Sequence, residues 1–292
     1  MTGDTVGAAS AAYRKKRVKR IKRIIVGTCI FLLLFPTILS IILMFKVASL
    51  EHKIDVITEN KLREEQLANN DVAQAKEKKE LTTPEPVKKR VYLTFDDGPG
   101  AETKKILDVL KKENVKATFF VTGKEDEFAK KLYKRIVKEG HTLGMHSYSH
   151  IYDSIYESKE AFTKDLEQIY EYLYQITGER PTFYRFPGGS STESTQIPIQ
   201  TFIQVLQEKH FTYMDWNVIS PDIGNPSITK EQMISSIMEN VNQFDTSVVL
   251  LYDSEERPLT AKALPILIQT LKQENYELLP MDSNTPLVQH NR

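Results

Sequence analysis

Two adjacent carboxylates, Asp96 and Asp97, end a short apolar run and directly precede a Gly-Pro turn. This pattern predicts a position at the carboxyl end of a strand, where α/β proteins keep their catalytic groups. His146 and His150 follow about fifty residues later. Two imidazoles and one carboxylate form a suitable three-ligand set for a catalytic metal, and the other carboxylate is then free to act as a base.

Each motif is weak evidence when it is taken alone. Asp-Asp-Gly-Pro is also a good turn sequence, and two histidines at this spacing usually occur by chance. On one helical turn, His146 and His150 would project to the same side. Since both motifs stand beside predicted strand ends, we interpret them together as a functional site.

Strand and helix patterns alternate from residue 90 onward. Apolar or β-branched runs predict strands at Val91–Phe95, Ala117–Val121, His141–Met145, Thr182–Phe186, Phe211–Trp216, Val248–Tyr252 and Tyr276–Pro280. Helical spacing separates them at Glu102–Lys112, Glu125–Lys138, Lys159–Thr177, Pro198–Lys209, Lys230–Asn242 and Leu259–Gln273. This alternation predicts an α/β domain with a parallel sheet, open or closed into a barrel. The predicted strand ends carry Asp96, Asp97, His146, Arg185, Trp216 and Tyr252.

The N-terminal part has the features of a membrane anchor. Residues 14–23 contain eight Lys or Arg, and residues 24–45 contain no charged residue. Such an apolar stretch is long enough to cross a hydrocarbon core of about 30 Å. The basic cluster predicts a cytoplasmic tail at residues 1–23, a membrane helix at 24–45 and an external remainder. The alternative is a signal peptide cleaved near residues 47–49, although its apolar region is usually about 7–15 residues.

Residues 46–87 are predicted to form a stalk. Glu, Lys, Gln, Asn and Ala dominate this stretch, and its apolar residues are thinly and irregularly spaced. We expect a solvated, partly helical segment; a short dimeric coiled coil is the alternative, but sustained heptads are missing. The Thr-Pro-Glu-Pro sequence at residues 83–86 should end any helix. An outer domain at residues 88–292 is therefore expected.

Composition narrows the class of protein. Residues 1–23 hold eight of the 39 basic residues and one of the 39 acidic ones, so 31 basic and 38 acidic residues remain. An acidic outer part argues against a nucleic-acid surface. Cys29, the only cysteine, lies in the apolar segment, so the outer domain has no disulfide. Such a surface protein is more typical of Gram-positive bacteria.

The motifs together resemble those of the polysaccharide deacetylases, the NodB-type carbohydrate esterases of family four. The Thr-Phe-Asp-Asp-Gly-Pro sequence at 94–99 and the His-Ser-Tyr-Ser-His sequence at 146–150 are similar to the first two family motifs. Arg-Phe-Pro-Gly-Gly at 185–189 resembles the third, and residues 138–144 resemble the segment that leads into the second. The resemblance covers about residues 88–282 and implies a distorted barrel of strands and helices.

The resemblance also implies roles for the motif residues. Asp97, His146 and His150 would bind a divalent metal; zinc is expected, with cobalt or another divalent ion as the alternative. Asp96 would act as general base, and Arg185 would keep it ionised and oriented.

Substrate contacts are implied near the third and fourth motifs. The backbone N–H of Gly188 is a candidate donor to the oxyanion. Pro187 and Trp216 are the other expected substrate-binding residues.

The chain departs from the family pattern at the fourth motif. That motif usually has an Asp followed by Trp, six residues after an earlier Trp. Here Asp222 stands six residues after Trp216 and is followed by Ile223. Asp222 therefore fits as a catalytic residue, while Asp215, which directly precedes Trp216, is the alternative.

The last motif departs further, because Leu-Leu-Tyr-Asp replaces the usual Leu-x-His-Asp. Tyr252 thus stands where the family has its general acid. With a reference pKa of about 10, Tyr252 is protonated at neutral pH and could donate a proton, but less readily than an imidazolium. Losing a positioned acid costs about 10²–10⁴ in rate. Alternatively, Tyr252 only fills space.

Two functional hypotheses follow. The first is a membrane-anchored, metal-dependent N-deacetylase that acts outside the cell on an N-acetylated glycan, with peptidoglycan N-acetylglucosamine as the expected substrate. O-acetyl xylan and a secreted poly-N-acetylglucosamine are the alternatives. The second is a homologue that binds metal and glycan without efficient turnover, which Tyr252 and Ile223 motivate. Both hypotheses imply one membrane span and no nucleic acid; the oligomeric state stays open.

Overall fold

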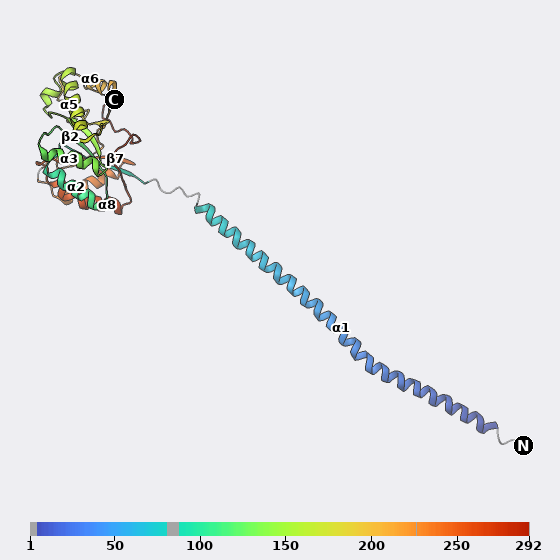
Figure 1. The fold of residues 1–292 in the computed structure, drawn as a ribbon. Helices are drawn as coiled ribbons and strands as arrows, with labels where there is room; N and C mark the ends of the chain where they lie inside the picture. The colour runs from blue at the N-terminus through green and yellow to red at the C-terminus, as the bar shows by residue number, and fades with distance from the viewer. Residues whose placement is uncertain (1–4, 81–87, 226, 292) are drawn as a thin grey trace. The chain divides into compact units, whose positions relative to one another are not determined.

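The computed structural model describes residues 5–80, 88–225 and 227–291 (Figure 1). The chain divides into two compact units, Met1–Glu85 and Pro86–Arg292, and each is described by itself. The helix end that we predicted at residues 83–86 lies outside the described residues.

The first unit is one long helix, α1 (Thr5–Glu80), with Pro36 inside it. The predicted stalk is therefore helical throughout its described part rather than partly helical, because Ala, Glu, Lys and Gln are strong helix formers. By length and composition, the stretch Lys16–Ala48, which contains an 18-residue window with a mean hydropathy of 2.6, could cross a membrane.

The second unit is built on a parallel sheet. Its strands are β1 (Arg90–Asp96), β2 (Thr118–Thr122), β3 (Thr142–Ser147), β4 (Phe183–Tyr184), β5 (Thr212–Tyr213), β6 (Val218–Ile219), β7 (Thr246–Tyr252) and β8 (Glu277–Leu278). Seven of them follow the order β5-β4-β3-β2-β1-β7-β6, and β8 pairs with β1. Within the described residues, the edge strands β5 and β6 do not pair with each other, so the sheet is a half-barrel. The predicted α/β class with about seven parallel strands is confirmed.

Three strand predictions were too long: β4 and β8 each cover only two residues of the predicted Thr182–Phe186 and Tyr276–Pro280, and the third differs most. We expected a single strand over Phe211–Trp216, but β5 covers only its centre and the separate strand β6 follows. The chain leaves the ladder at Asp215, whose N–H donates to Val288 O and whose carbonyl accepts from the Arg185 side chain. These long-range bonds replace the strand pairing that the local pattern suggested.

Helices form the outer layer over the convex face of the sheet. They are α2 (Ala101–Glu113), α3 (Glu127–Lys138), the unpredicted short helix α4 (Tyr152–Ile155), α5 (Lys159–Thr177), α6 (Ile199–Glu208), α7 (Lys230–Val241) and α8 (Leu259–Gln273). Adjacent helices contact each other in the order α6-α5-α3-α2-α8-α7. This order follows that of the strands, as expected when each helix returns beside the strand it connects.

The alternation of side chains along β1 decides where the first motif points. Val91, Leu93 and Phe95 belong to the main core. Tyr92 belongs to a second cluster, together with Phe120, Phe183, Met214, Val248 and Met281. Because successive strand side chains point to opposite faces, Asp96 shares the face of Tyr92, inside the half-barrel.

His141, just before β3, makes the domain sensitive to acid. Its Nδ1 accepts the N–H of Ala117 at 3.2 Å. Burial, followed by the nearby Lys116, lowers the pKa of His141 to about 4. The unfolded chain, with a pKa of about 6.5, binds a proton first as the pH falls. We expect this group to lower the free energy of unfolding by about 2 kcal/mol between pH 7.5 and 5. Urea unfolding of His141→Gln at both pH values should show a correspondingly smaller loss; an unchanged loss would contradict this.

Candidate active site

The carboxyl ends of three strands bring the first two motifs and Tyr252 together. Asp96 ends β1 and is paired in register with Tyr252 at the end of β7. His146 lies near the end of β3, which pairs with β2, the other neighbour of β1. Parallel strands place these ends at one edge of the sheet, so residues about 50 and 150 positions apart meet there.

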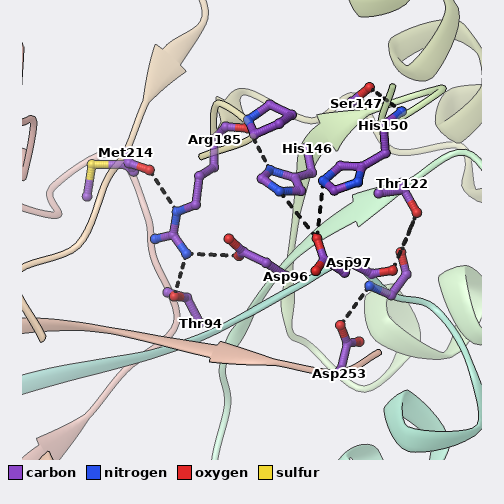
Figure 2. Close-up of polar contacts among 12 residues, drawn as sticks. Thr94, Asp96, Asp97, Thr122, His146, Ser147, His150, Arg185, Met214 and Asp253 are labelled. Atoms are coloured by element: carbon purple, nitrogen blue, oxygen red, sulfur yellow. Dashed lines mark hydrogen bonds and ion pairs between the residues drawn. The ribbon is translucent and has the colours of Figure 1, made fainter. Parts of the chain in front are cut away.

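Asp97, His146 and His150 converge on one point (Figure 2). Asp97 Oδ1 lies 3.5 Å from His146 Nε2 and 3.3 Å from His150 Nε2. Both Asp97 Oδ1 and His150 Nε2 are buried without a hydrogen-bond partner among the described residues. Buried polar atoms normally have partners, so this cluster fits a bound cation.

The two imidazoles differ in their protonation. His146 Nδ1 donates to the carbonyl of Arg185 at 2.7 Å, so Nε2 is the ring nitrogen that faces Asp97. Burial lowers the pKa of His146, but the charges of Asp96 and Asp97 outweigh it and raise that pKa, so a bound cation would displace the Nε2 proton. Burial, followed by the charge of His146, lowers the pKa of His150 to about 4, so its ring is neutral at pH 7. Two nitrogen donors and one oxygen donor form a set that zinc commonly takes in catalytic sites.

The two histidines do not share a helical turn, so the helical geometry that we proposed was wrong. His146 is in β3, while His150 ends the loop that follows, with a φ of 51°. Asp165, on α5, accepts from Ser147 Oγ at 2.8 Å and from the N–H groups of Tyr148 and Ser149 at 2.9 Å each. This buried carboxylate folds the loop back, and thereby brings His150 next to His146.

We expect Asp165→Ala to weaken zinc binding by about 10- to 100-fold, the effect typical of losing an outer partner of a metal ligand. The loop between the two histidines would lose three acceptor contacts at once. Competition with a fluorescent chelator would measure the affinity, and exposed Asp153→Ala is the matched control. An affinity equal to that of the unaltered chain would show that the loop holds its shape without Asp165.

Asp96 points away from this cluster, toward Arg185 (Figure 2). The Arg185 side chain is fully buried, and its Nη1 donates to Asp96 Oδ1 at 2.9 Å and to Thr94 Oγ1 at 2.7 Å. Its Nε and Nη2 donate to the carbonyls of Met214 and Asp215. Burial raises the pKa of Asp96, and the guanidinium opposes that shift. The pair is therefore an internal ion pair with fixed geometry, and not a surface salt bridge.

Asp253 fixes the turn that follows the two carboxylates. Its Oδ1 accepts the N–H of Gly98 at 2.7 Å, and its Oδ2 accepts from Thr103 Oγ1 at 2.6 Å. A Cβ at Gly98 would lie 2.1 Å from the Asp253 carboxylate, so only glycine fits there. Asp97, at a φ of 78°, is held in left-handed backbone by this arrangement.

The loop after Arg185 carries the expected substrate contacts. Gly188 and Gly189 have φ values of 80° and 78°, a conformation that suits glycine. The Pro187 carbonyl accepts from Tyr156 Oη at 2.9 Å. Trp216 packs on Gly189, where a Cβ would approach the indole to 2.8 Å. The loop and Trp216 are thus in contact, as expected if both bind the substrate.

The structure separates the two candidates for the fourth-motif Asp. Asp215 is fully buried, and its carboxylate accepts from Ser190 N, Ser190 Oγ and His290 N at 2.6–2.8 Å. Asp222 follows β6, and its Oδ1 accepts from Ser220 Oγ at 2.6 Å. Its Oδ2 is buried and has no partner among the described residues. Asp215 therefore anchors the loop after Arg185, whereas Asp222 keeps one free acceptor.

Tyr252 lies near Asp96 and Asp97, and Arg257 links it to Asp222. Burial, and then the charges of Asp96 and Asp97, raise the pKa of the Tyr252 hydroxyl above its ordinary value. The Arg257 guanidinium lies over the Tyr252 ring, 5.3 Å from its centroid, and donates to the carbonyl of Asp222. The Tyr252 hydroxyl is therefore protonated and lies near Asp96 and Asp97.

Sequence reasoning missed Asp165, Asp253 and the C-terminal residues His290 and Asn291. Asp165 is one of several acidic residues on an ordinary amphipathic helix, and no local signal distinguishes it. Asp253 is the last residue of the quoted Leu-Leu-Tyr-Asp motif, but no role was assigned to it. His290 contacts Trp216 edge-on at 5.0 Å, and Asn291 Nδ2 donates to the Ser190 carbonyl. Only the tertiary structure reveals these contacts.

Known proteins match the part of the chain that carries these residues. Residues 83–206 match the family model described as Polysaccharide deacetylase. A peptidoglycan-N-acetylglucosamine deacetylase of Bacillus cereus is 34% identical over 201 residues, which cover 67% of this chain and 68% of that protein. The YheN protein of Bacillus subtilis is 36% identical over 191 residues, 64% of this chain and 65% of its own length.

A solved structure agrees with the sequence comparison. The catalytic domain of peptidoglycan N-acetylglucosamine deacetylase from Eubacterium rectale superposes with a TM-score of 0.66 at 37% identity. The match covers 72% of this chain and 96% of that domain, so the half-barrel fold is shared over nearly the whole of that domain.

Proposed function

Because the chain belongs to the polysaccharide deacetylase family, we propose that it removes acetyl groups from the N-acetylglucosamine residues of peptidoglycan. The observation that carries this proposal is the combination of a three-ligand cluster with a separate, buried carboxylate. Asp97, His146 and His150 face one another, while Asp96 is held apart by Arg185. A site for binding alone would not need the second carboxylate.

In this proposal Asp97, His146 and His150 hold zinc or another divalent ion. When bound, such an ion polarises the acetamide carbonyl and makes a nearby water more acidic. Asp96 takes a proton from the attacking water, since one of its oxygens is held by Arg185 and the other remains available. The raised pKa of Asp96, caused by burial, makes it a stronger base than an exposed aspartate.

The remaining groups would stabilise the tetrahedral intermediate and the leaving amine. The Gly188 N–H is the proposed donor to the developing oxyanion, and Pro187 and Trp216 would contact the sugar. Tyr252 would donate its proton to the nitrogen as the C–N bond breaks, which releases acetate and a free amine. The proton held by Asp96 then restores the Tyr252 hydroxyl. In this scheme Asp222 supports the leaving-group side of the site through its loop contact with Arg257.

Membrane attachment is part of the proposal. The basic residues 14–23 would stay in the cytoplasm, and the apolar stretch at 24–45 would cross the membrane once. Residues from 88 onward would then act on the cell wall from outside. The apolar helix and the wall-directed names of the relatives support this arrangement; a cleaved signal peptide is the competing interpretation.

A second candidate function is a homologue that binds metal and glycan with little turnover. It rests on Tyr252 in place of the usual acid and on Ile223 after Asp222. The buried Asp96–Arg185 pair favours the enzyme, because burying a charged pair costs free energy that a binding role would not require.

The decisive experiment is an assay of the 292-residue chain in detergent, with zinc or cobalt. Mass spectrometry would follow acetyl loss from chitooligosaccharides, peptidoglycan fragments and acetylated xylan. Acetyl loss from peptidoglycan that chelation abolishes would support the deacetylase. Metal and glycan binding without acetyl loss from any substrate would support the second candidate.

A further inference from the structure

A cavity of about 600 Å³ lies beside the proposed catalytic centre, between the loop after β6 and the start of α8. Arg257 joins the two regions, because its guanidinium lies over the Tyr252 ring and also lines the cavity. A group attached to the sugar that loses its acetyl group could therefore extend into this cavity.

The cavity has unused hydrogen-bond donors. The Arg257 side chain makes one hydrogen bond among the described residues, to the carbonyl of Asp222. A guanidinium carries five N–H donors, so most of its capacity remains free. Lys262, on the first turn of α8, is exposed and has no ion-pair partner in the described part of the chain. Two cationic groups in one cavity favour an anionic ligand, and arginine suits a carboxylate in particular.

The cavity also holds two acidic groups, Asp222 and Glu256, and neither forms an ion pair with Arg257 or Lys262 among the described residues. Asp222 is only 5% exposed and is bound to Ser220, while its free Oδ2 can accept a hydroxyl or amide proton. Glu256 is exposed, and hydrogen bonds to its own backbone N–H and to Ser254 lower its pKa. Its carboxylate therefore has partners of its own at the rim.

An apolar surface completes the lining. Ile228 and Leu259, both half-buried, line the cavity. The site thus offers cations for a carboxylate, an apolar wall for a small alkyl group, and one buried acceptor.

We infer that this cavity receives the lactyl substituent of the muramic acid next to the N-acetylglucosamine that is deacetylated. Where no peptide is attached, a lactyl ether carries a carboxylate and a methyl group, which match Arg257 with Lys262 and Ile228 with Leu259. The neighbouring hydroxyl or acetamide N–H would bind Asp222 Oδ2. This inference rests on the proposed function, since it names the feature by which the site would distinguish peptide-free peptidoglycan strands from neutral chitin.

The test compares three substrates with the zinc-loaded 292-residue chain. They are chitotetraose, peptide-free glycan with a free lactyl carboxylate, and glycan whose lactyl group bears a peptide. We expect the highest kcat/KM for the free lactyl form. Lys262→Glu should lower the preference for it over chitotetraose about tenfold through KM, since the substitution replaces an attraction by a repulsion. Lys164→Glu, at an exposed position on α5, is the charge-matched control.

Several outcomes would overturn the inference. Equal kcat/KM on the lactyl and neutral substrates would do so, as would a Lys262→Glu effect of the same size on both. The highest kcat/KM on the peptide-bearing form would assign the cavity to the peptide instead.

Failure of catalysis can be separated from failure of this site. If no substrate loses acetate, the proposed function fails, but binding still tests the cavity. Trp216 is the single tryptophan of the chain, so its fluorescence can report binding. An N-acetylglucosamine–muramic acid disaccharide should then bind about tenfold more tightly than chitobiose, and Lys262→Glu should remove that difference. Equal affinities would overturn the inference whatever the activity.

Discussion

Asp96→Asn is expected to lower kcat by about 10³-fold, within the 10²–10⁴ range typical of a positioned proton acceptor. The amide is nearly isosteric, and its oxygen can still accept from Arg185 Nη1, which now binds Asp96 at 2.9 Å. The substitution therefore removes the base without removing the partner of the buried guanidinium. Acetate release from peptidoglycan fragments, measured at saturating zinc, checks this.

Metal content and thermal unfolding separate this effect from loss of the site. Asp96→Asn should bind zinc as the unaltered chain does, because its carboxylate faces Arg185 and not the His146–His150 pair. Asp97→Asn is the matched comparison and should lose zinc affinity, since Asp97 Oδ1 lies within 3.5 Å of both imidazole nitrogens. A fully active Asp96→Asn would exclude Asp96 as the base.

Tyr252→Phe is expected to lower kcat by about 10²-fold, and Tyr252→His to raise it above that of the unaltered chain by about tenfold or more. Phenylalanine has no proton to give to the leaving nitrogen. An imidazolium, with a reference pKa of about 6.5, gives up its proton more readily near neutral pH than a phenol does. Steady-state rates on the same peptidoglycan fragments measure both changes.

The pH profile tests whether Tyr252 acts as the general acid. A general acid must be protonated, and burial raises the pKa of the Tyr252 hydroxyl above its ordinary value. The unaltered chain should therefore keep its activity as the pH rises to about 9, whereas Tyr252→His should lose activity above about pH 7. If Tyr252→Phe retains full activity, Tyr252 only fills space and another group protonates the amine.

The amino-acid sequence determined the strands that carry the site, because their signals are local. Alternation along β1 and the turn that follows it placed Asp96 and Asp97 at a strand end, and β3 and β7 were recognised in the same way. These patterns predicted the α/β class and indicated that His146 and Tyr252 would lie at the same edge of the sheet. Strand alternation also fixes that Asp96 faces the inside of the half-barrel.

Only the tertiary structure decided how the candidate residues are held. Asp165 and Asp253 satisfy backbone donors of the ligand loop and of the turn, from positions 16 and 155 residues away in sequence. Long-range hydrogen bonds also ended β5 early. They occupy the carboxylate of Asp215, whereas Asp222 keeps a free oxygen within the described part of the chain. Such contacts leave no periodicity and no compositional signal in the sequence. They arise when folding buries polar groups, which must then find partners wherever the chain supplies them. The sequence thus indicated the candidate residues and the edge of the sheet where they lie, and the packed structure set their geometry.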